Sequence, residues 1–146
     1  MKYFFDTSVL VAAISVNHMH HVPSQAAYLA ASKNNSSCAA HSLAEVYATL
    51  TRIPGAQRMS CEQALLFVED IRERLTTIAL EQDEYFPSIA DAAAEGIAGG
   101  TIYDALIARC ALKGKAAVIY TWNLDHFRRI GPEVARRVQT PGIKRE

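Results

Sequence analysis

Residues 2–14 have the sequence KYFFDTSVLVAAI, and this stretch decides which class of fold the chain adopts. The aromatic run at residues 2–5 is typical of a short strand, and Asp6 ends it. Residues 7–14 then predict a helix. A strand that passes at once into a helix places Asp6 at the carboxyl end of the first strand.

The same alternation of strand-like and helical patterns continues along the chain. Because strands separated by helices pair in parallel, we expect an α/β fold whose mostly parallel sheet carries helices on both faces. Pro87 fits its helix only in the first turn. The elements expected after residue 14 are a loop at 17–21, a turn at 34–37, helices at 23–32, from Ser42, from Ser60, at 85–98 and at 101–113, and strands at 38–40, 76–80, 116–120 and 138–140.

Composition limits the class of protein. The chain has 146 residues, half of them apolar and 21% charged, which is typical of one soluble globular domain. We expect this single domain to span residues 1–146, with 142–146 as a loose tail. The 15 basic and 15 acidic residues cancel, so RNA binding would require a local basic patch.

Several locations and types of site are excluded. No apolar run approaches the ~20 residues that span a bilayer, and Asp6 interrupts the segment that most resembles a signal peptide. Cys38, Cys61 and Cys110 are odd in number and widely spaced. This spacing argues against a disulfide framework or a cysteine zinc site and fits the reducing cytoplasm. We expect the three cysteines to fill core positions.

Oxygen-bearing side chains follow the predicted strands. Asp6 follows the first strand, Asn123 and Asp125 follow the last buried strand, and Glu45 and Asp104 lie in the first turns of two predicted helices. Because ligands of open α/β sheets bind beyond the carboxyl ends of the strands, we expect these side chains to converge. Clustered carboxylates require protons or a cation, and an all-oxygen set favours Mg²⁺ or Mn²⁺ over Zn²⁺. Such a site can hydrolyse a phosphodiester without a nucleophilic side chain.

Each acid also has a structural interpretation. Glu45 is the fourth residue of a capping box that starts at Ser42, and Asp104 has the same relation to Thr101. Asp6 could cap the helix that follows it. Taken singly, each acid is better explained as a cap, whereas together they favour a ligand site. A cap can also bind a ligand, so both interpretations remain open.

Four segments resemble the motifs of the PIN-domain family, and within it those of VapC-type ribonuclease toxins of toxin–antitoxin pairs. The resemblance covers nearly the whole chain, with the motifs in the family's order. The segments are 5–10, 42–48 with 50–54, 103–108, and 121–123 with 126–127.

This resemblance implies a PIN-like three-layer α/β/α sandwich with a Mg²⁺-dependent endoribonuclease site, in which Mn²⁺ substitutes. Asp6, Glu45 and Asp104 would bind the metal. The family's fourth position, often acidic, falls on Asn123, with Asp125 as the alternative. A metal-activated water would attack the RNA phosphodiester and leave a 5′-phosphate and a 3′-hydroxyl.

The resemblance also implies partners, namely an RNA substrate, a cognate antitoxin and a second copy of the chain, with no membrane. Ser8, Arg52 and Thr121 are candidate RNA contacts. The antitoxin would lie in a groove near the helices around Glu45 and Leu66. Leu66 lies off the apolar stripe of its helix, which is consistent with a partner surface.

Basic side chains elsewhere are weaker candidates. Arg109, Lys113 and Lys115 could hold RNA phosphates, although a solvated face is the better explanation for each of them. His126 follows the last motif and could orient a neighbour.

His18, His20 and His21 form a tight group on a predicted loop. No further ligands at zinc spacing are adjacent, so a metal role is disfavoured. Contact with RNA is a better explanation, and plain solvent exposure is the simplest.

Two other functions compete. In an aspartyl-phosphate enzyme Asp6 would be the nucleophile, but Ser8 occupies the position where one major class needs a second acid. In a non-catalytic RNA- or protein-binding module the same fold would carry no activity, although clustered acids are poorly suited to an RNA surface. A nucleotide-binding module is disfavoured, since no glycine-rich phosphate loop follows the first strand.

Overall fold

The computed structural model describes residues 1–142 and contains one five-stranded sheet, in which every strand pairs in parallel. The strand order is β3-β2-β1-β4-β5. The predicted parallel α/β sheet is therefore confirmed, with β5 at an edge as expected. The strands are β1 (Tyr3–Phe5), β2 (Ser36–Ala39), β3 (Thr76–Ile78), β4 (Val118–Tyr120) and β5 (Val138–Gln139).

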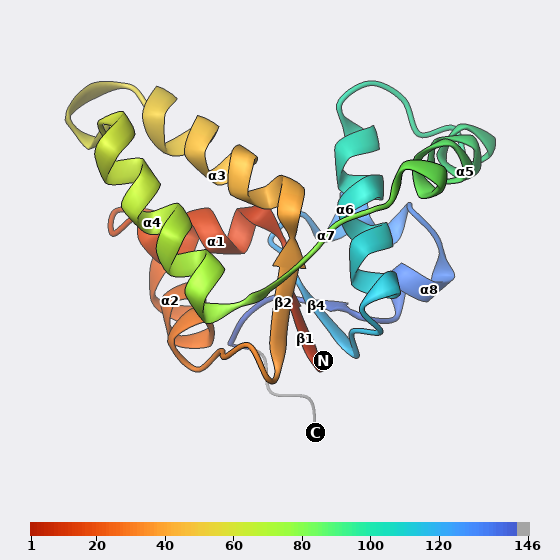
Figure 1. Cartoon of the computed structure of the whole chain (residues 1–146), viewed down its shortest axis with the longest axis horizontal. Coiled ribbons are helices and arrows are strands. Elements are labelled where there is room, and N and C mark those ends of the chain that lie inside the picture. Colours follow the sequence, from red (N-terminus) through yellow and green to blue (C-terminus); the bar gives the residue numbers. More distant parts are fainter. Residues whose placement is uncertain (143–146) are drawn as a thin grey trace.

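Helices cover both faces of the sheet. Figure 1 shows α1 to α4 on one side of the strands and α5, α6 and α8 on the other, so the molecule has three layers. No helix in the described part of the chain is long and apolar enough to cross a membrane. The helices are α1 (Thr7–Ile14), α2 (His21–Leu29), α3 (Ala40–Arg52), α4 (Cys61–Arg74), α5 (Gln82–Ala94), α6 (Thr101–Lys113), α7 (Leu124–Arg128) and α8 (Pro132–Ala135), with a 3₁₀ turn at Gly55–Gln57.

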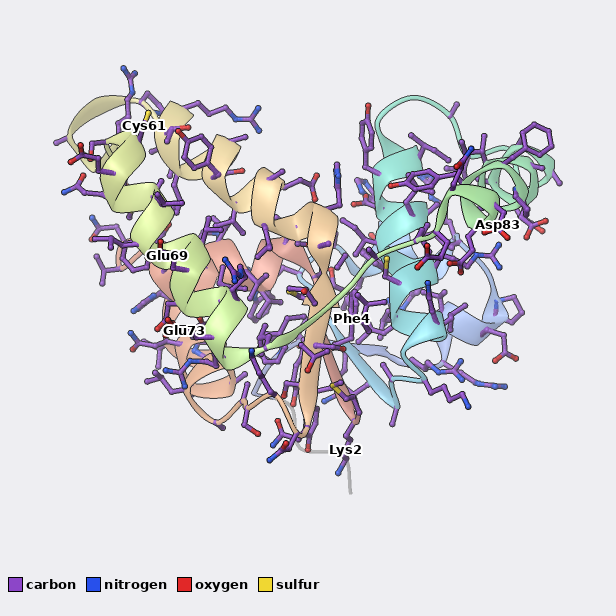
Figure 2. All side chains as sticks on the ribbon, in the orientation of Figure 1. Lys2, Phe4, Cys61, Glu69, Glu73 and Asp83 are labelled. Carbon is purple, nitrogen blue, oxygen red and sulfur yellow. The ribbon has the colours of Figure 1, made fainter. Side chains whose placement is uncertain are left out.

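Alternation along β1 divides the core into two clusters. Phe5 packs with residues of α1, α3 and α4 on one face, and Phe4 packs with residues of α6, α7 and α8 on the other. Both rings are buried, since successive strand residues point to opposite faces. Figure 2 places Phe4 in the centre of the molecule, whereas Glu69 and Glu73 lie on the outer side of α4.

The position of β1 in the sheet creates the place where a ligand can bind. The chain passes from β1 to β2 on one side of β1, and β4 later pairs on its other side. Phe5 is in register with Cys38 of β2 and Tyr120 of β4, so the three strands end at the same level. The crevice beyond such a switch in strand order is the usual ligand site of open α/β sheets.

Several predicted boundaries are wrong, and a capping box explains one of them. α3 begins at Ala40, two residues before the expected Ser42. α5 begins at Gln82 because Glu81 and Glu84 form a capping box, so Pro87 lies inside the helix and not in its first turn. α5 also ends at Ala94, short of the expected residue 98.

Other segments differ by smaller shifts. Helix α2 spans His21–Leu29 and not the expected 23–32, and β2 includes Ser36 and Ser37 from the predicted turn. Helices α7 and α8 were not predicted, since neither exceeds five residues. The ranges of α1 and α6 and the capping box at Ser60 are confirmed. Of the expected tail, residues 143–146 lie outside the described residues.

The cysteines divide into two kinds. Cys38 and Cys110 are buried, as expected for core residues. The prediction is wrong for Cys61, which is exposed at the first position of α4 (Figure 2). Its position after the Ser60 cap places it on the first turn of the helix, before the buried stripe begins at Ala64.

Candidate active site

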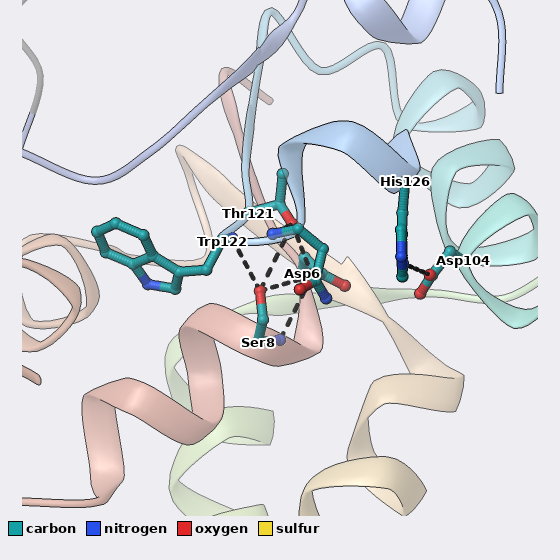
Figure 3. Close-up of polar contacts among 7 residues, drawn as sticks. Asp6, Ser8, Asp104, Thr121, Trp122 and His126 are labelled. Carbon is teal, nitrogen blue, oxygen red and sulfur yellow. Dashed lines mark hydrogen bonds and ion pairs between the residues drawn. The ribbon is translucent and has the colours of Figure 1, made fainter. Parts of the chain in front are cut away.

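Asp6 directly follows β1 and caps helix α1, as one of its two interpretations predicted. Its Oδ2 accepts hydrogen bonds from the hydroxyls of Ser8 at 2.7 Å and Thr121 at 2.9 Å, and from the Ser8 backbone N–H at 3.4 Å (Figure 3). All the hydrogen bonds that Asp6 accepts from described side chains end on Oδ2, which leaves Oδ1 for a ligand. The side chain is 1% exposed.

Burial dominates the electrostatics of this carboxyl group. It raises the pKa of Asp6 to about 6, against the opposing effect of hydrogen bonds from Ser8 and Thr121. The negative charge of Asp104 raises the pKa of Asp6 further. A buried acid of this kind is stabilised in its ionised form by any cation that enters beside it.

Glu45 reaches the same region from the second turn of α3. Its Oε1 lies 2.8 Å from the Thr7 hydroxyl, which also lies 2.8 Å from Ser42 Oγ, and its Oε2 lies 3.9 Å from His41 Nε2. The predicted capping box is wrong here, because α3 starts at Ala40 and Ser42 is already a buried helical residue. Glu45 is therefore free of any capping role.

Asp104 lies in the first turn of α6, where the N-cap residue is Gly100 and no side chain caps the helix. The capping interpretation of Thr101 and Asp104 is therefore wrong as well. Asp104 Oδ2 instead lies 3.4 Å from His126 Nδ1 on α7 (Figure 3). Burial raises the pKa of Asp104, the hydrogen bond and charge of His126 lower it, and the charge of Glu45 raises it.

These three carboxylates line one open cavity of about 460 Å³ at the carboxyl ends of β1 and β4. Asp6, Glu45, Asp104 and Asn123 therefore line the same cavity, and the structure brings them together from two helices and two strand-end loops. No lysine or arginine is among the described residues that line the cavity. Its lining residues are Asp6, Thr7, Ser8, Val11, His18, His20, Glu45, Thr49, Asp104, Trp122 and Asn123.

The donor set suits a hard divalent cation. The acids supply only oxygen, and the charges of Asp104 and its neighbours disfavour ionisation unless a cation compensates them. Within residues 1–142, no three His, Cys, Asp or Glu side chains are grouped so that they could bind one ion together. This arrangement still fits Mg²⁺, which proteins commonly bind through one or two carboxylates and several waters.

Two predicted residues lie elsewhere. Asp125 does not line the cavity, because its side chain is 96% exposed and lies 3.9 Å from Arg128 on the same short helix. Arg52 is exposed in the last turn of α3, away from the cavity lining. The structure thus places Asn123, and not Asp125, beside the three acids.

The other basic candidates also lie away from the acids. Arg109 pairs with Asp91 at 2.5 Å and Lys113 pairs with Glu84 at 2.6 Å, which ties both cations to α5. Lys115 lies between α6 and β4, at the amino-terminal end of β4, whereas the acids lie beyond the carboxyl ends of the strands. None of the three lines the carboxylate cavity.

Further side chains lie beside the acids, and their contacts differ from those expected from the sequence. Ser8 and Thr121, expected to contact RNA, both bond to Asp6, and Thr121 is fully buried. His20 stacks on Trp122 at the cavity wall, so the simple expectation of solvent exposure for the histidine group is wrong. No local pattern could indicate a stack between residues so far apart in the sequence.

Comparison with known proteins agrees with the geometry. The family model of the PIN domain matches residues 3–132. No curated protein matches the sequence. The solved structures that share the fold include three that are each less than 25% identical to this chain.

Two of these structures are VapBC complexes. A chain of VapBC2 from Rickettsia felis, bound to a DNA fragment of its promoter, has 22% identity and a TM-score of 0.66 over 97% of this chain and 99% of that chain. A chain of VapBC-1 from nontypeable Haemophilus influenzae has 19% identity and a TM-score of 0.65 over 96% and 98%.

The third is VapC20 of Mycobacterium tuberculosis, a toxin that cleaves the sarcin–ricin loop, with 14% identity and a TM-score of 0.70 over 86% of this chain and 92% of that chain. The family model covers most of the sequence, and the parallel sheet with acids beyond β1 and β4 has the architecture that the motifs implied. The chain belongs to the PIN-domain family.

Proposed function

We propose that this protein is a divalent-metal-dependent endoribonuclease that cleaves RNA phosphodiesters. The observation that carries the proposal is the convergence of Asp6, Glu45 and Asp104 on one open cavity at the switch in strand order. The electrostatic coupling of Asp6 to Asp104 and of Asp104 to Glu45 supports a cation as the missing partner.

Mg²⁺, with Mn²⁺ as a substitute, would bind among Asp6, Glu45 and Asp104, directly through one or two of these carboxylates and through water to the rest. When bound, such an ion activates water as a nucleophile and neutralises charge on the phosphodiester. Asn123, which lines the same cavity, adds an amide that can accept or donate a hydrogen bond but brings no charge. The site would therefore have three acids and one neutral side chain.

The surrounding residues hold the acids in place. Ser8 and Thr121 fix one oxygen of Asp6, and Thr7 fixes one oxygen of Glu45. His126 of α7, which does not itself line the cavity, contacts Asp104. Such supporting hydrogen bonds orient carboxylate ligands and commonly change metal affinity or activity 10- to 100-fold when removed.

We further propose that the protein acts as the toxin of a toxin–antitoxin pair, with a cognate antitoxin and a second copy of the chain as partners. Support comes from the shared fold with chains of two VapBC complexes and with a VapC toxin that cleaves RNA. The exposed Leu65, Leu66 and Phe67 on α4 provide an apolar surface for such a partner.

The test is RNA cleavage by the purified protein with Mg²⁺, with Mn²⁺ and with EDTA. Asp104→Asn removes one acid from the cavity, and Asp83→Asn is the matched control, because Asp83 lies exposed in the first turn of α5. We expect metal-dependent cleavage by wild type and Asp83→Asn, and at least a 100-fold lower rate for Asp104→Asn.

Equal rates in the two variants would indicate a contaminating ribonuclease and would leave the protein without a demonstrated activity. Metal binding without cleavage of any structured RNA, including tRNA and rRNA fragments, would contradict the proposal. It would favour a non-catalytic binding module on the same fold.

A further inference from the structure

One wall of the carboxylate cavity is aromatic. The rings of His20 and Trp122 stack with their centroids 3.7 Å apart and an angle of 6° between their planes. The ring of His18 lies 5.7 Å from that of His20, and all three residues line the cavity with Asp6 and Asp104. We call His18, His20 and Trp122 the aromatic wall.

Hydrogen bonds hold the indole of Trp122 in a fixed orientation. Its Nε1–H donates to Ser24 Oγ at 2.8 Å, and its backbone N–H donates to Ser8 Oγ at 3.0 Å. Ser24 is fully buried, and Ser8 is the residue whose hydroxyl also bonds to Asp6. Both N–H groups of Trp122 are thus used within the protein, and His20 covers one face of its ring, so the stacked pair offers a ligand only its outer π surface.

The position of the aromatic wall relative to the acids is visible in Figure 3. In this view Trp122 lies on one side of Asp6, and Asp104 with His126 lies on the other. The shared hydroxyl of Ser8 fixes the spacing between Trp122 and Asp6. A nucleotide whose phosphate lies against the acids would therefore place a neighbouring base near the wall.

Charge favours stacking over phosphate contacts at this wall. No described residue of the cavity lining is a lysine or arginine, and the three acids repel phosphate. Burial, together with the nearby His20 and His21, lowers the pKa of His18, which disfavours a positive charge on this ring. Stacking of bases on flat rings needs no charge and tolerates any base.

We propose that the stacked pair of His20 and Trp122 binds one unpaired base of single-stranded RNA, beside the phosphodiester that lies against the carboxylates. The choice of RNA as the ligand rests on the proposed function. Bases within a duplex have both faces covered by their neighbours. The aromatic wall therefore selects nucleotides in loops, bulges or single strands, whose faces are open.

Trp122 is the only tryptophan of the chain, so its fluorescence reports on the wall directly. The experiment titrates the Asp104→Asn protein with an unstructured RNA of eight nucleotides and with an abasic oligomer of the same length and charge. Excitation at the long-wavelength edge of tryptophan absorption avoids absorption by the bases. The same titrations are made with His20→Ala, with His20→Phe, and with Met19→Ala as the control, since Met19 is 86% exposed in the same loop.

We expect the RNA to quench Trp122 and to bind at least tenfold more tightly than the abasic oligomer. His20→Ala should weaken RNA binding about 5- to 100-fold, the range measured when a stacking side chain is truncated. His20→Phe keeps a flat ring and should stay within about threefold, as should Met19→Ala.

Equal affinity for the two oligomers, an unchanged affinity in His20→Ala, or no binding of either oligomer would overturn the proposal. The stack would then serve only to close the loop between α1 and α2. Base-dependent quenching in a protein that cleaves no RNA would uphold the stacking proposal and refute the proposed hydrolysis, so the two can fail separately.

Discussion

The hydroxyl of Thr121 donates a fully buried hydrogen bond of 2.9 Å to Asp6 Oδ2. The same oxygen of Thr121 accepts the backbone N–H of Asn123 at 3.0 Å. One hydroxyl group thus joins the residue that follows β1 to the loop that follows β4. This bridge fixes the two sides of the crevice at the level where the strands end.

Replacing Thr121 with valine should therefore weaken both the fold and the site. The variant keeps the shape but leaves Asp6 with one donor fewer and the N–H of Asn123 without its acceptor. We expect a loss of about 1–3 kcal/mol in the free energy of unfolding, measured by urea denaturation. Thr121→Ser should restore most of it.

The control for this change is Thr77→Val, at an exposed position of β3, which should alter stability by less than about 0.5 kcal/mol. A similar loss in both variants would mean that valine itself, and not the lost bridge, causes the effect.

Asp6 should make the stability of the metal-free protein depend on pH. Its pKa is raised by burial from 3.8 to about 6, so the folded state binds this proton more tightly than the unfolded state. The contribution is fully present below pH 4 and is lost as the pH rises through 6. The difference corresponds to about 3 kcal/mol at pH 8.

Asp6→Asn should remove this pH dependence. In EDTA the variant should be more stable than wild type at pH 8, and with Mg²⁺ it should no longer cleave RNA. Urea denaturation of both proteins at pH 4, 6 and 8 measures the effect, with Asp83→Asn as the exposed control. A difference between Asp6→Asn and wild type that stays constant from pH 4 to pH 8 would contradict this assignment.

The sequence predicts the parts of the site that depend on local order. Asp6, Asn123 and Asp104 each follow a strand or begin a helix, so the rule that parallel strands end at one edge was enough to bring them together. Glu45 was placed correctly for a partly wrong reason, because the predicted capping box at Ser42 does not exist. The position of Glu45 near the other acids follows from its place early in the helix after β2, and it does not depend on the residue at which that helix begins.

The sequence could not predict contacts between distant side chains. The stack of His20 on Trp122 depends on the path of the loop between α1 and α2, which no periodicity records. The role of Asp125 was open for a related reason. A side chain two residues from Asn123 can point into the cavity or into solvent. The short helix α7 orients Asp125 toward solvent.

His126 should influence the site through Asp104. Its ring lies 3.4 Å from Asp104 Oδ2, so His126→Ala removes a group that orients this acid. We expect a 10- to 100-fold lower rate of RNA cleavage together with a higher Mg²⁺ concentration for half-maximal activity. His126→Asn, which keeps a donor, should recover part of the loss.

Arg128→Ala on the same helix serves as the control, because Arg128 lies 3.9 Å from the exposed Asp125 and does not line the cavity. A lower rate without any change in the Mg²⁺ requirement would argue against a role of His126 in orienting Asp104.

The thiols should differ sharply in reactivity. Burial raises the pKa of Cys38 to about 12 and that of Cys110 to about 11, so neither forms a thiolate at neutral pH, whereas Cys61 is exposed. Iodoacetamide should add to one site per native chain and to three after unfolding, as counted by intact mass. Cys61→Ser should take up no label when folded; rapid labelling of that variant would show that the core opens.

The identity of the fourth residue of the site can be decided by three variants. Asn123 lines the cavity with the three acids, whereas Asp125 is 96% exposed, so Asn123→Ala should lower the rate of RNA cleavage at least tenfold and Asp125→Asn should leave it within about twofold. Asn123→Asp should lower the Mg²⁺ concentration needed for half-maximal activity, because a fourth carboxylate adds an attractive charge to the cavity. The opposite pattern, with loss of activity in Asp125→Asn alone, would require α7 to rotate when RNA binds and would assign the fourth position to Asp125.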